Sequence, residues 1–140
     1  MYNKILVTTD GSEGSKAAID HVSRIAKKFD SCVNILYVVD VRKGPQNVAD
    51  IVRNGFEEIG RQATEKIRDE LQNKDISAEA YIEYGIPHEQ ILEFSKQKNI
   101  DMIVISTHGR TGLDRLLIGS VTEKIVRNSK APVLTVGREK

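Results

Sequence analysis

Patterns typical of strands and of helices alternate along the whole chain, and this alternation limits the folds that the chain can adopt. Apolar runs indicate buried strands at Ile5–Thr9, Val33–Val39, Met102–Ile105 and Val133–Val136. Between them, apolar residues recur three or four positions apart, which is the spacing of one helix face. Strands separated by helices imply βαβ units, so we expect an α/β fold with a mostly parallel sheet. The two longest helical stripes are Ala18, Val22, Ile25, Ala26 and Phe29, and Val52, Phe56, Ile59, Ala63, Ile67 and Leu71.

Four further segments complete this pattern. Ser77–Glu83 alternates apolar and polar residues, which predicts a strand buried on one side only, as at the edge of a sheet. Pro87 suits the first turn of a short helix, and Ser120–Asn128 has the spacing of another helix. Asp40–Asp50 predicts a long loop that is a candidate for a mobile flap.

Size and charge narrow the class of protein. A chain of 140 residues can bury a proper core, so we expect one domain over residues 1–140, with three α/β/α layers. Acidic and basic residues nearly cancel at +1, which does not indicate a surface for nucleic acid. The apolar runs are too short for a signal peptide or a membrane span, so we expect a cytoplasmic protein without a membrane partner. Cys32 is the only cysteine, which excludes an internal disulfide, and its apolar surroundings predict a buried strand residue.

Polar residues follow two of the expected strands. Thr8-Thr9-Asp10-Gly11-Ser12 ends the first strand, and Ser106-Thr107-His108-Gly109 ends the fourth. Open parallel sheets bind ligands beyond the carboxyl ends of their strands, where the winding direction switches. A flavodoxin-like strand order, 3-2-1-4-5, would make these two strands neighbours, and their polar ends would then share one crevice.

The second of these segments has the parts of a phosphate site. Gly109 is followed nine residues later by Gly119-Ser120, where a helix is expected to begin. Free N–H groups at a helix start bind anions, and glycine lets a phosphate approach the backbone. Ser120 through Glu123 also fits a capping box, in which both side chains satisfy backbone donors of the helix itself. Both roles of Ser120 remain open at this point.

These residues resemble the universal stress protein (UspA-like) family over the whole chain. The resemblance rests on Ile5 to Ser12, Leu36 to Asp40, Gly85 to Glu89 and, most specifically, Ser106 to Glu123. It implies an adenine nucleotide alpha hydrolase-like fold with the strand order 3-2-1-4-5. It also implies homodimers joined along the last strand, Val133–Val136.

The ATP-binding branch of this family carries the pattern Gly-x-x-Gly-x9-Gly-Ser/Thr. Gly109, Gly119 and Ser120 match it, whereas Ser106 takes the place of the first glycine. A serine there still offers its N–H and adds a hydroxyl, provided that its φ stays negative.

The resemblance implies how a nucleotide would be held. Asp10 would contact it through the ribose or through Mg²⁺ (or Mn²⁺) bound to the phosphates, because a bare carboxylate repels phosphate. Val38 would present backbone groups to the adenine edge, and His108 would act through its backbone. Arg110 is a candidate for neutralising phosphate charge, and an ordinary exposed loop arginine is the equal alternative. The full set of expected site residues is Thr8, Thr9, Asp10, Val38, Ser106, Thr107, His108, Gly109, Arg110, Gly119, Ser120, Val121 and Thr122.

The sequence therefore favours a homodimeric, ATP-binding regulator of the stress-protein type, with little or no turnover and an unidentified protein partner. It contains no Gly-x-x-x-x-Gly-Lys-Ser/Thr loop and no Gly-x-Gly-x-x-Gly after the first strand. Two alternatives remain: a UspA-like interaction module that does not bind ATP, and a slow Mg²⁺-dependent ATPase.

Overall fold

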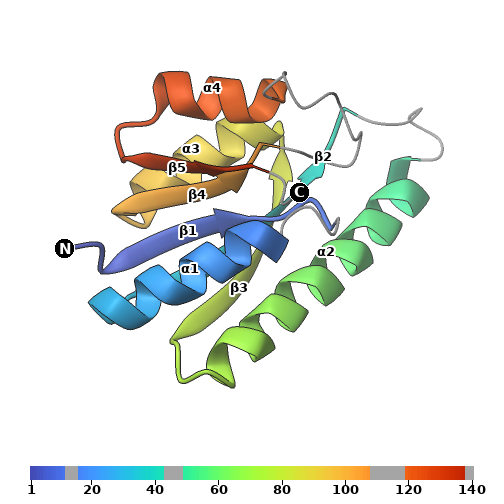
Figure 1. Ribbon diagram of the computed structural model, residues 1–140. Coiled ribbons are helices and arrows are strands. Elements are labelled where there is room, and N and C mark those ends of the chain that lie inside the picture. The colour runs from blue at the N-terminus through green and yellow to red at the C-terminus, as the bar shows by residue number, and fades with distance from the viewer. Residues whose placement is uncertain (12–15, 43–48, 108–118, 138–140) are drawn as a thin grey trace.

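The computed structural model describes residues 1–11, 16–42, 49–107 and 119–137, and at residues 49–54 it describes the backbone without the side chains. The elements alternate between strand and helix from one end of the chain to the other (Figure 1). In chain order they are β1 (Lys4–Thr8), α1 (Lys16–Phe29), β2 (Cys32–Asp40), α2 (Ala49–Gln72), β3 (Ala78–Gly85), α3 (Pro87–Gln97), β4 (Met102–Ser106), α4 (Ser120–Asn128) and β5 (Val133–Val136).

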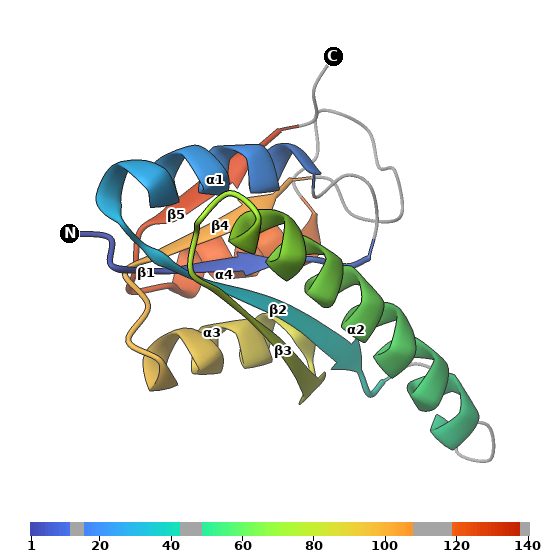
Figure 2. The same cartoon turned by 90° about the horizontal axis from the view of Figure 1, so that it is seen from below.

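The strands form one parallel sheet in the order β3-β2-β1-β4-β5, which confirms the expected fold class and strand order. Helices α1 and α2 cover one face of this sheet, and α3 and α4 cover the other (Figures 1 and 2). The chain winds from β1 outward to β3, then crosses to β4 on the other side of β1. The winding direction therefore switches between β1 and β4, which is where such sheets bind ligands.

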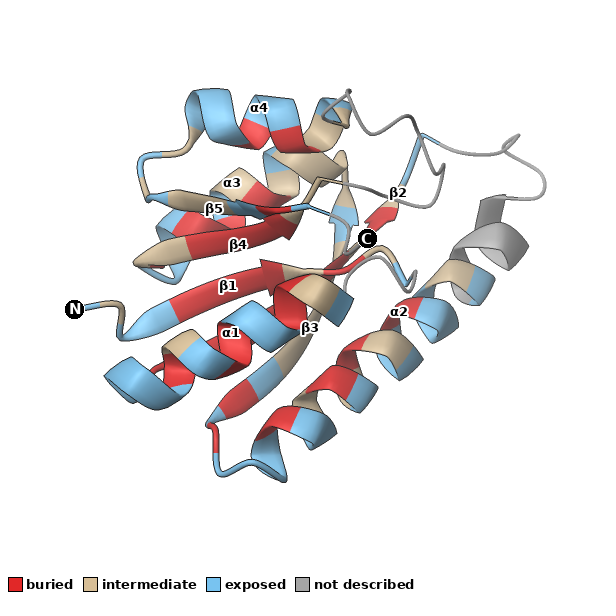
Figure 3. Cartoon of the chain, in the orientation of Figure 1, coloured by how far each residue is buried: buried red, intermediate tan, exposed pale blue. Residues whose placement is uncertain are grey.

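Apolar residues dominate the central strands because helices cover both of their sides. Ile5, Leu6 and Val7 in β1 are fully buried (Figure 3). Ile5 and Val7 belong to the cluster under α1 and α2, whereas Leu6 belongs to the cluster with α3 and α4. Alternate residues of one strand therefore fill two separate apolar layers.

Two of the described side chains in the expected helical stripes are exposed. Phe29 is 41% exposed and Ile59 is 40% exposed. Phe29 is the last residue of α1 and lies edge-on to Tyr2, with ring centroids 5.3 Å apart. In α2 the position that faces the sheet is Gly60, whose Cα lies against the ring of Tyr37, and this contact turns Ile59 toward solvent.

The strand at the β3 edge differs from its prediction in one respect. β3 is an edge strand, as expected, but it is not buried on one side only. Ala78 joins the core under α2, and Tyr81 packs on the opposite face against Phe94, with centroids 5.0 Å apart. Cys32 is a strand residue but is half-buried rather than buried, and the Ser77 hydroxyl lies 3.6 Å from its Sγ.

Two other expectations concern the surroundings of the sheet. Pro87 is in the first turn of α3, as expected. Residues 43–48, which make up most of the expected flap, lie outside the described residues. Among the described helices, none has a stretch long and apolar enough to span a bilayer.

The close approach of α2 to β2 at Gly60 gives a test of the fold. A Cβ atom built at Gly60 would lie 2.2 Å from Cδ1 of Tyr37, whereas one at Gly55 would meet nothing within 4 Å. We expect Gly60→Ala to lower the free energy of unfolding by about 1–3 kcal/mol, since α2 must move away from the sheet. We expect Gly55→Ala to raise it by about 0.5–1 kcal/mol, because alanine is the better helix former. Urea unfolding of both variants measures this difference, and equal effects would contradict the packing described here.

Candidate functional site

The central strand stops before its neighbours at the carboxyl edge of the sheet, and we call the region beyond its last residue the space above β1. The last pair between β1 and β2 is Thr8 with Leu36, but β2 continues to Asp40. The last pair between β1 and β4 is Val7 with Val104, but β4 continues to Ser106. The ends of β2 and β4 therefore flank the point where β1 ends.

Main-chain groups of both flanking strands face this space. In β2, the Leu36 carbonyl accepts from the Thr9 N–H at 3.1 Å, so Leu36 faces β1. Backbone direction alternates along a strand, and the N–H and C=O of Val38, two residues on, therefore face the same side beyond the last pair. In β4, the Thr107 N–H donates to Val136 in β5 at 2.9 Å, so the main-chain groups of Ser106 face toward β1.

The chain that leaves β1 turns sharply within this space. Thr9 is 8% exposed, and its Oγ1 accepts from the Gly11 N–H at 3.1 Å. Gly11 has a φ of +83°, a conformation that favours glycine. Asp10 is part of this turn and is half-buried. It follows the end of β1, the strand that lies between β2 and β4, as the expected strand order requires.

The start of α4 has a different cap from the expected one. Gly119 is the N-cap residue, with φ −57° and ψ 152°, so the cap residue itself makes no side-chain hydrogen bond to the helix. The capping box at Ser120 is therefore wrong: Ser120 is already inside the helix, and the Glu123 N–H bonds to the Gly119 carbonyl at 3.0 Å. The Glu123 carboxylate instead accepts from Arg127 at 2.8 Å. The N–H groups of Ser120, Val121 and Thr122 precede the first intrahelical bond, and such groups at a helix start can bind an anion.

A side chain ties this helix start to the end of β4. Thr122 is 4% exposed, and its hydroxyl donates to the Ser106 carbonyl at 3.1 Å. The Thr107 Oγ1 also lies 3.4 Å from the Val136 carbonyl. The first turn of α4 is therefore bonded directly to the strand end that lines the space above β1.

The backbone at Ser106 does not require glycine. Within the described ranges, the residues other than glycine with positive φ are Tyr2, Asp30, Asp75 and Asn99. Ser106 is the last residue of β4, paired with Val136. The extended strand conformation that a serine needs at this position is therefore present.

Of the expected site residues, His108, Gly109 and Arg110 lie outside the described residues. The other members lie at the ends of β1, β2 and β4 or in the first turn of α4. Elsewhere in the ranges that the structure describes, no three His, Cys, Asp or Glu side chains are grouped so that they could hold a metal ion.

Sequence reasoning missed an ion pair at the end of β2. Arg42 donates to both carboxylate oxygens of Asp40, at 3.0 and 2.9 Å, and its backbone N–H also bonds to Asp40. The hydrogen bond to Asp40 raises the pKa of the Arg42 guanidinium. The sequence does place these two opposite charges two residues apart, directly after an apolar strand, and this spacing could have indicated the ion pair. This pair fixes the course of the chain two residues beyond Val38.

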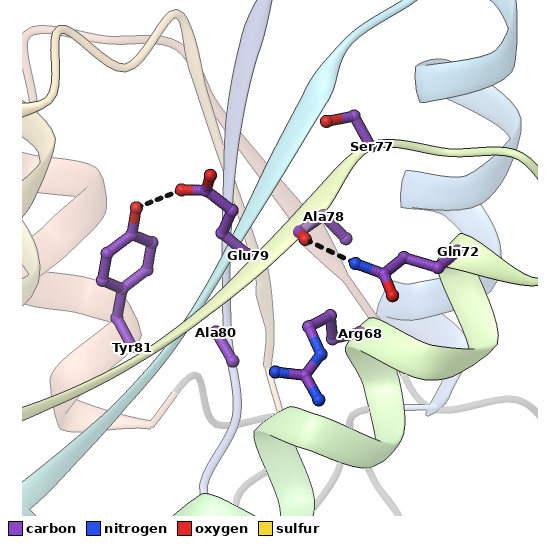
Figure 4. A pocket seen from close by; sticks show the side chains of 7 residues that line it. All are labelled: Arg68, Gln72, Ser77, Ala78, Glu79, Ala80 and Tyr81. Carbon is purple, nitrogen blue, oxygen red and sulfur yellow. Dashed lines mark hydrogen bonds between the residues drawn. The ribbon is translucent and has the colours of Figure 1, made fainter.

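A hollow of about 630 Å³ lies elsewhere, at the outer edge of the sheet (Figure 4). It follows the amino-terminal half of β3, whereas the space above β1 lies at the carboxyl edge. Arg68 and Gln72 reach it from α2, and Gln72 donates to the Ala78 carbonyl at 3.2 Å. On the other side of the strand, the hydrogen bond to Glu79 raises the pKa of Tyr81 to about 12. This hollow shares no residue with the site at the strand ends.

Comparison with known proteins agrees with the geometry. The model of the universal stress protein family matches residues 1–137. The chain therefore belongs to the universal stress protein family.

Individual relatives match over nearly their whole lengths. Universal stress protein MJ0531 of Methanocaldococcus jannaschii is 35% identical over 144 residues, which cover 100% of this chain and 85% of the relative. The solved structure of the hypothetical protein MJ0577, from the same organism, has a TM-score of 0.92 at 34% identity and covers 100% of this chain and 99% of its own. A universal stress protein solved in complex with cAMP has a TM-score of 0.69 at 26% identity, with 97% of each chain covered.

Proposed function

We propose that this protein is a homodimeric regulator that binds an adenine nucleotide, ATP above all, at the carboxyl ends of β1, β2 and β4. The observation that carries the proposal is the early end of β1 at the switch point, with β2 and β4 extending beyond it. We infer that Asp10, the main chain of Val38 and the start of α4 at Gly119 surround a nucleotide there. A family relative in complex with cAMP supports an adenine nucleotide as the ligand class.

Each group has a physical role in this proposal. The main-chain N–H and C=O of Val38 can pair with the donor and acceptor on the edge of an adenine ring. The N–H groups of Ser120, Val121 and Thr122 bind phosphate oxygens, helped by the helix dipole. Asp10 acts through a ribose hydroxyl or through Mg²⁺ or Mn²⁺ carried by the phosphates, because carboxylate and phosphate repel each other directly.

The remaining expected residues complete the phosphate end of the site. Thr8, Thr9, Ser106 and Thr107 line it at the strand ends, and His108, Gly109 and Arg110 belong to the same motif. We assign the site to binding rather than turnover, since phosphoryl transfer also needs an oriented nucleophile, for which the sequence offers no candidate. A protein partner would then distinguish the nucleotide-bound from the nucleotide-free form.

The first test is calorimetry with ATP, AMP and cAMP, each with and without Mg²⁺. We expect ATP to bind most tightly with Mg²⁺. Asp10→Asn keeps the shape of the side chain and removes its charge, so it should weaken Mg²⁺–ATP by about tenfold and abolish the benefit of the metal. If Asp10 accepts a ribose hydroxyl instead, asparagine replaces it and the affinity stays unchanged. If millimolar nucleotide produces no heat of binding and no thermal shift, the proposal is overturned.

The second test uses Gly119, where a side chain has room in the ligand-free protein. A Cβ atom there would come no closer than 3.9 Å to the Thr107 carbonyl oxygen, and the φ of −57° suits any residue. We expect Gly119→Ala and Gly119→Val to change the stability by no more than about 1 kcal/mol. ATP affinity should fall from glycine to alanine to valine, because the side chain takes the place of a phosphate oxygen. Equal affinity in all three proteins, measured beside their melting temperatures, would show that α4 does not hold phosphate.

The proposed dimer forms through β5. This strand is an edge of the sheet, and its outward N–H and C=O groups are those of Val133 and Thr135, since Thr107 pairs with Val136 on the inner side. Exposed strand edges are usually covered, and a second copy of the same strand would cover this one with two-fold symmetry.

Proline at an outward position tests this edge. Thr135→Pro removes one outward N–H without removing a bond to β4, so we expect a monomer by light scattering at micromolar concentration. Ala80→Pro makes the matched change at the opposite edge, in β3, and should leave the dimer intact. A monomeric parent protein, or a dimer that survives Thr135→Pro, would count against the β5 interface.

A further inference from the structure

Thr122 is a buried hydroxyl in the first turn of α4, and its partner comes from another element. Its side chain is 4% exposed, and its Oγ1 donates to the Ser106 carbonyl at 3.1 Å. A threonine inside a helix commonly bonds back to its own helix, as Thr64 does with the Gly60 carbonyl at 2.8 Å in α2. Thr122 instead crosses to the end of β4.

The carbonyl that it reaches lies at the end of β4. The main-chain groups of Ser106 face β1, and Ser106 lies two residues beyond Val104, the last β4 residue that pairs with β1. Carbonyl groups shielded from water need a hydrogen-bond donor. The Thr122 hydroxyl is a donor to this carbonyl, and the bond connects the strand end to the helix start.

We propose that Thr122 is a positioning residue for the phosphate end of the site. Its hydroxyl bond to Ser106 holds the first turn of α4 at a fixed place relative to β4, so that the N–H groups of Ser120 and Val121 are aimed before a ligand arrives. Because the side chain is buried and its proton is donated to Ser106, any contact of Thr122 with phosphate is made by its backbone N–H. This inference rests on the proposed nucleotide site.

Three variants separate positioning from a general loss of stability. Thr122→Val keeps the branched shape and removes the hydroxyl, whereas Thr122→Ser keeps the hydroxyl. Thr64→Val is the matched control, since Thr64 is 1% exposed and carries a bonded hydroxyl in α2, against the opposite face of the sheet. Binding of ATP and of adenosine is measured by calorimetry for each protein, together with amide exchange at Glu123, whose N–H closes the first turn of α4.

We expect Thr122→Val to weaken ATP by about tenfold and to leave adenosine unchanged, because only the phosphates depend on α4. Thr122→Ser should restore ATP affinity, Thr64→Val should keep it, and the Glu123 amide should exchange faster in Thr122→Val alone. The inference is overturned if Thr122→Val binds ATP as tightly as the parent protein does. It is also overturned if Thr122→Val loses as much affinity for adenosine as for ATP, or if Thr64→Val loses as much ATP affinity as Thr122→Val. If the parent protein binds neither ligand, the proposed function fails, and unchanged exchange at Glu123 would then show separately that Thr122 does not fix the helix start.

Discussion

The arrangement of this molecule depends on a parallel sheet whose central strand is shorter than both of its neighbours. β1 must lie in the middle because the chain winds outward to β3 and then crosses back to β4. Since β1 ends at Thr8, the ends of β2 and β4 extend beyond it at the carboxyl edge of the sheet. The turn at Thr9 to Gly11 follows β1 there, and the Thr122 hydroxyl bonds the start of α4 to the end of β4. The site that we propose at these strand ends is built largely from the backbone rather than from a set of reactive side chains.

The order and type of the elements could be predicted because the strands have apolar runs and the helices have regular apolar stripes. The boundaries of α4 and β5 agree with the sequence to the residue. The sheet order came from the family resemblance and not from periodicity, because no local pattern records which strands become neighbours. The exposure of individual side chains was harder to predict. Ile59 continues the apolar stripe of α2 but is exposed, because the contact between Gly60 and Tyr37 decides which side of the helix faces the sheet.

In the candidate site too, some features could be predicted from the sequence and others could not. Its members at the strand ends could be found because polar residues directly follow apolar strands. The cap of α4 could not, because Gly119 and Ser120 are both acceptable N-cap residues and the sequence does not say which one takes that position. The role of Thr122 depends on a carbonyl sixteen positions away, and only the fold shows that the two groups meet. Ser106 departs from the glycine of the family pattern, but the extended backbone at the end of β4 accommodates it.

The two outer strands of the sheet are not equivalent, and their difference limits how large an assembly can grow. At β3, the Gln72 amide already occupies the Ala78 carbonyl, and Arg68 lies beside the same stretch of strand (Figure 4). Such side chains interfere with the pairing of another strand. A chain with one receptive edge and one obstructed edge can join a single copy of itself and then has no strand left to offer. In the proposed dimer, growth of the sheet would stop at ten strands, twice the five of one chain, so pairing through β5 would not lead to a polymer.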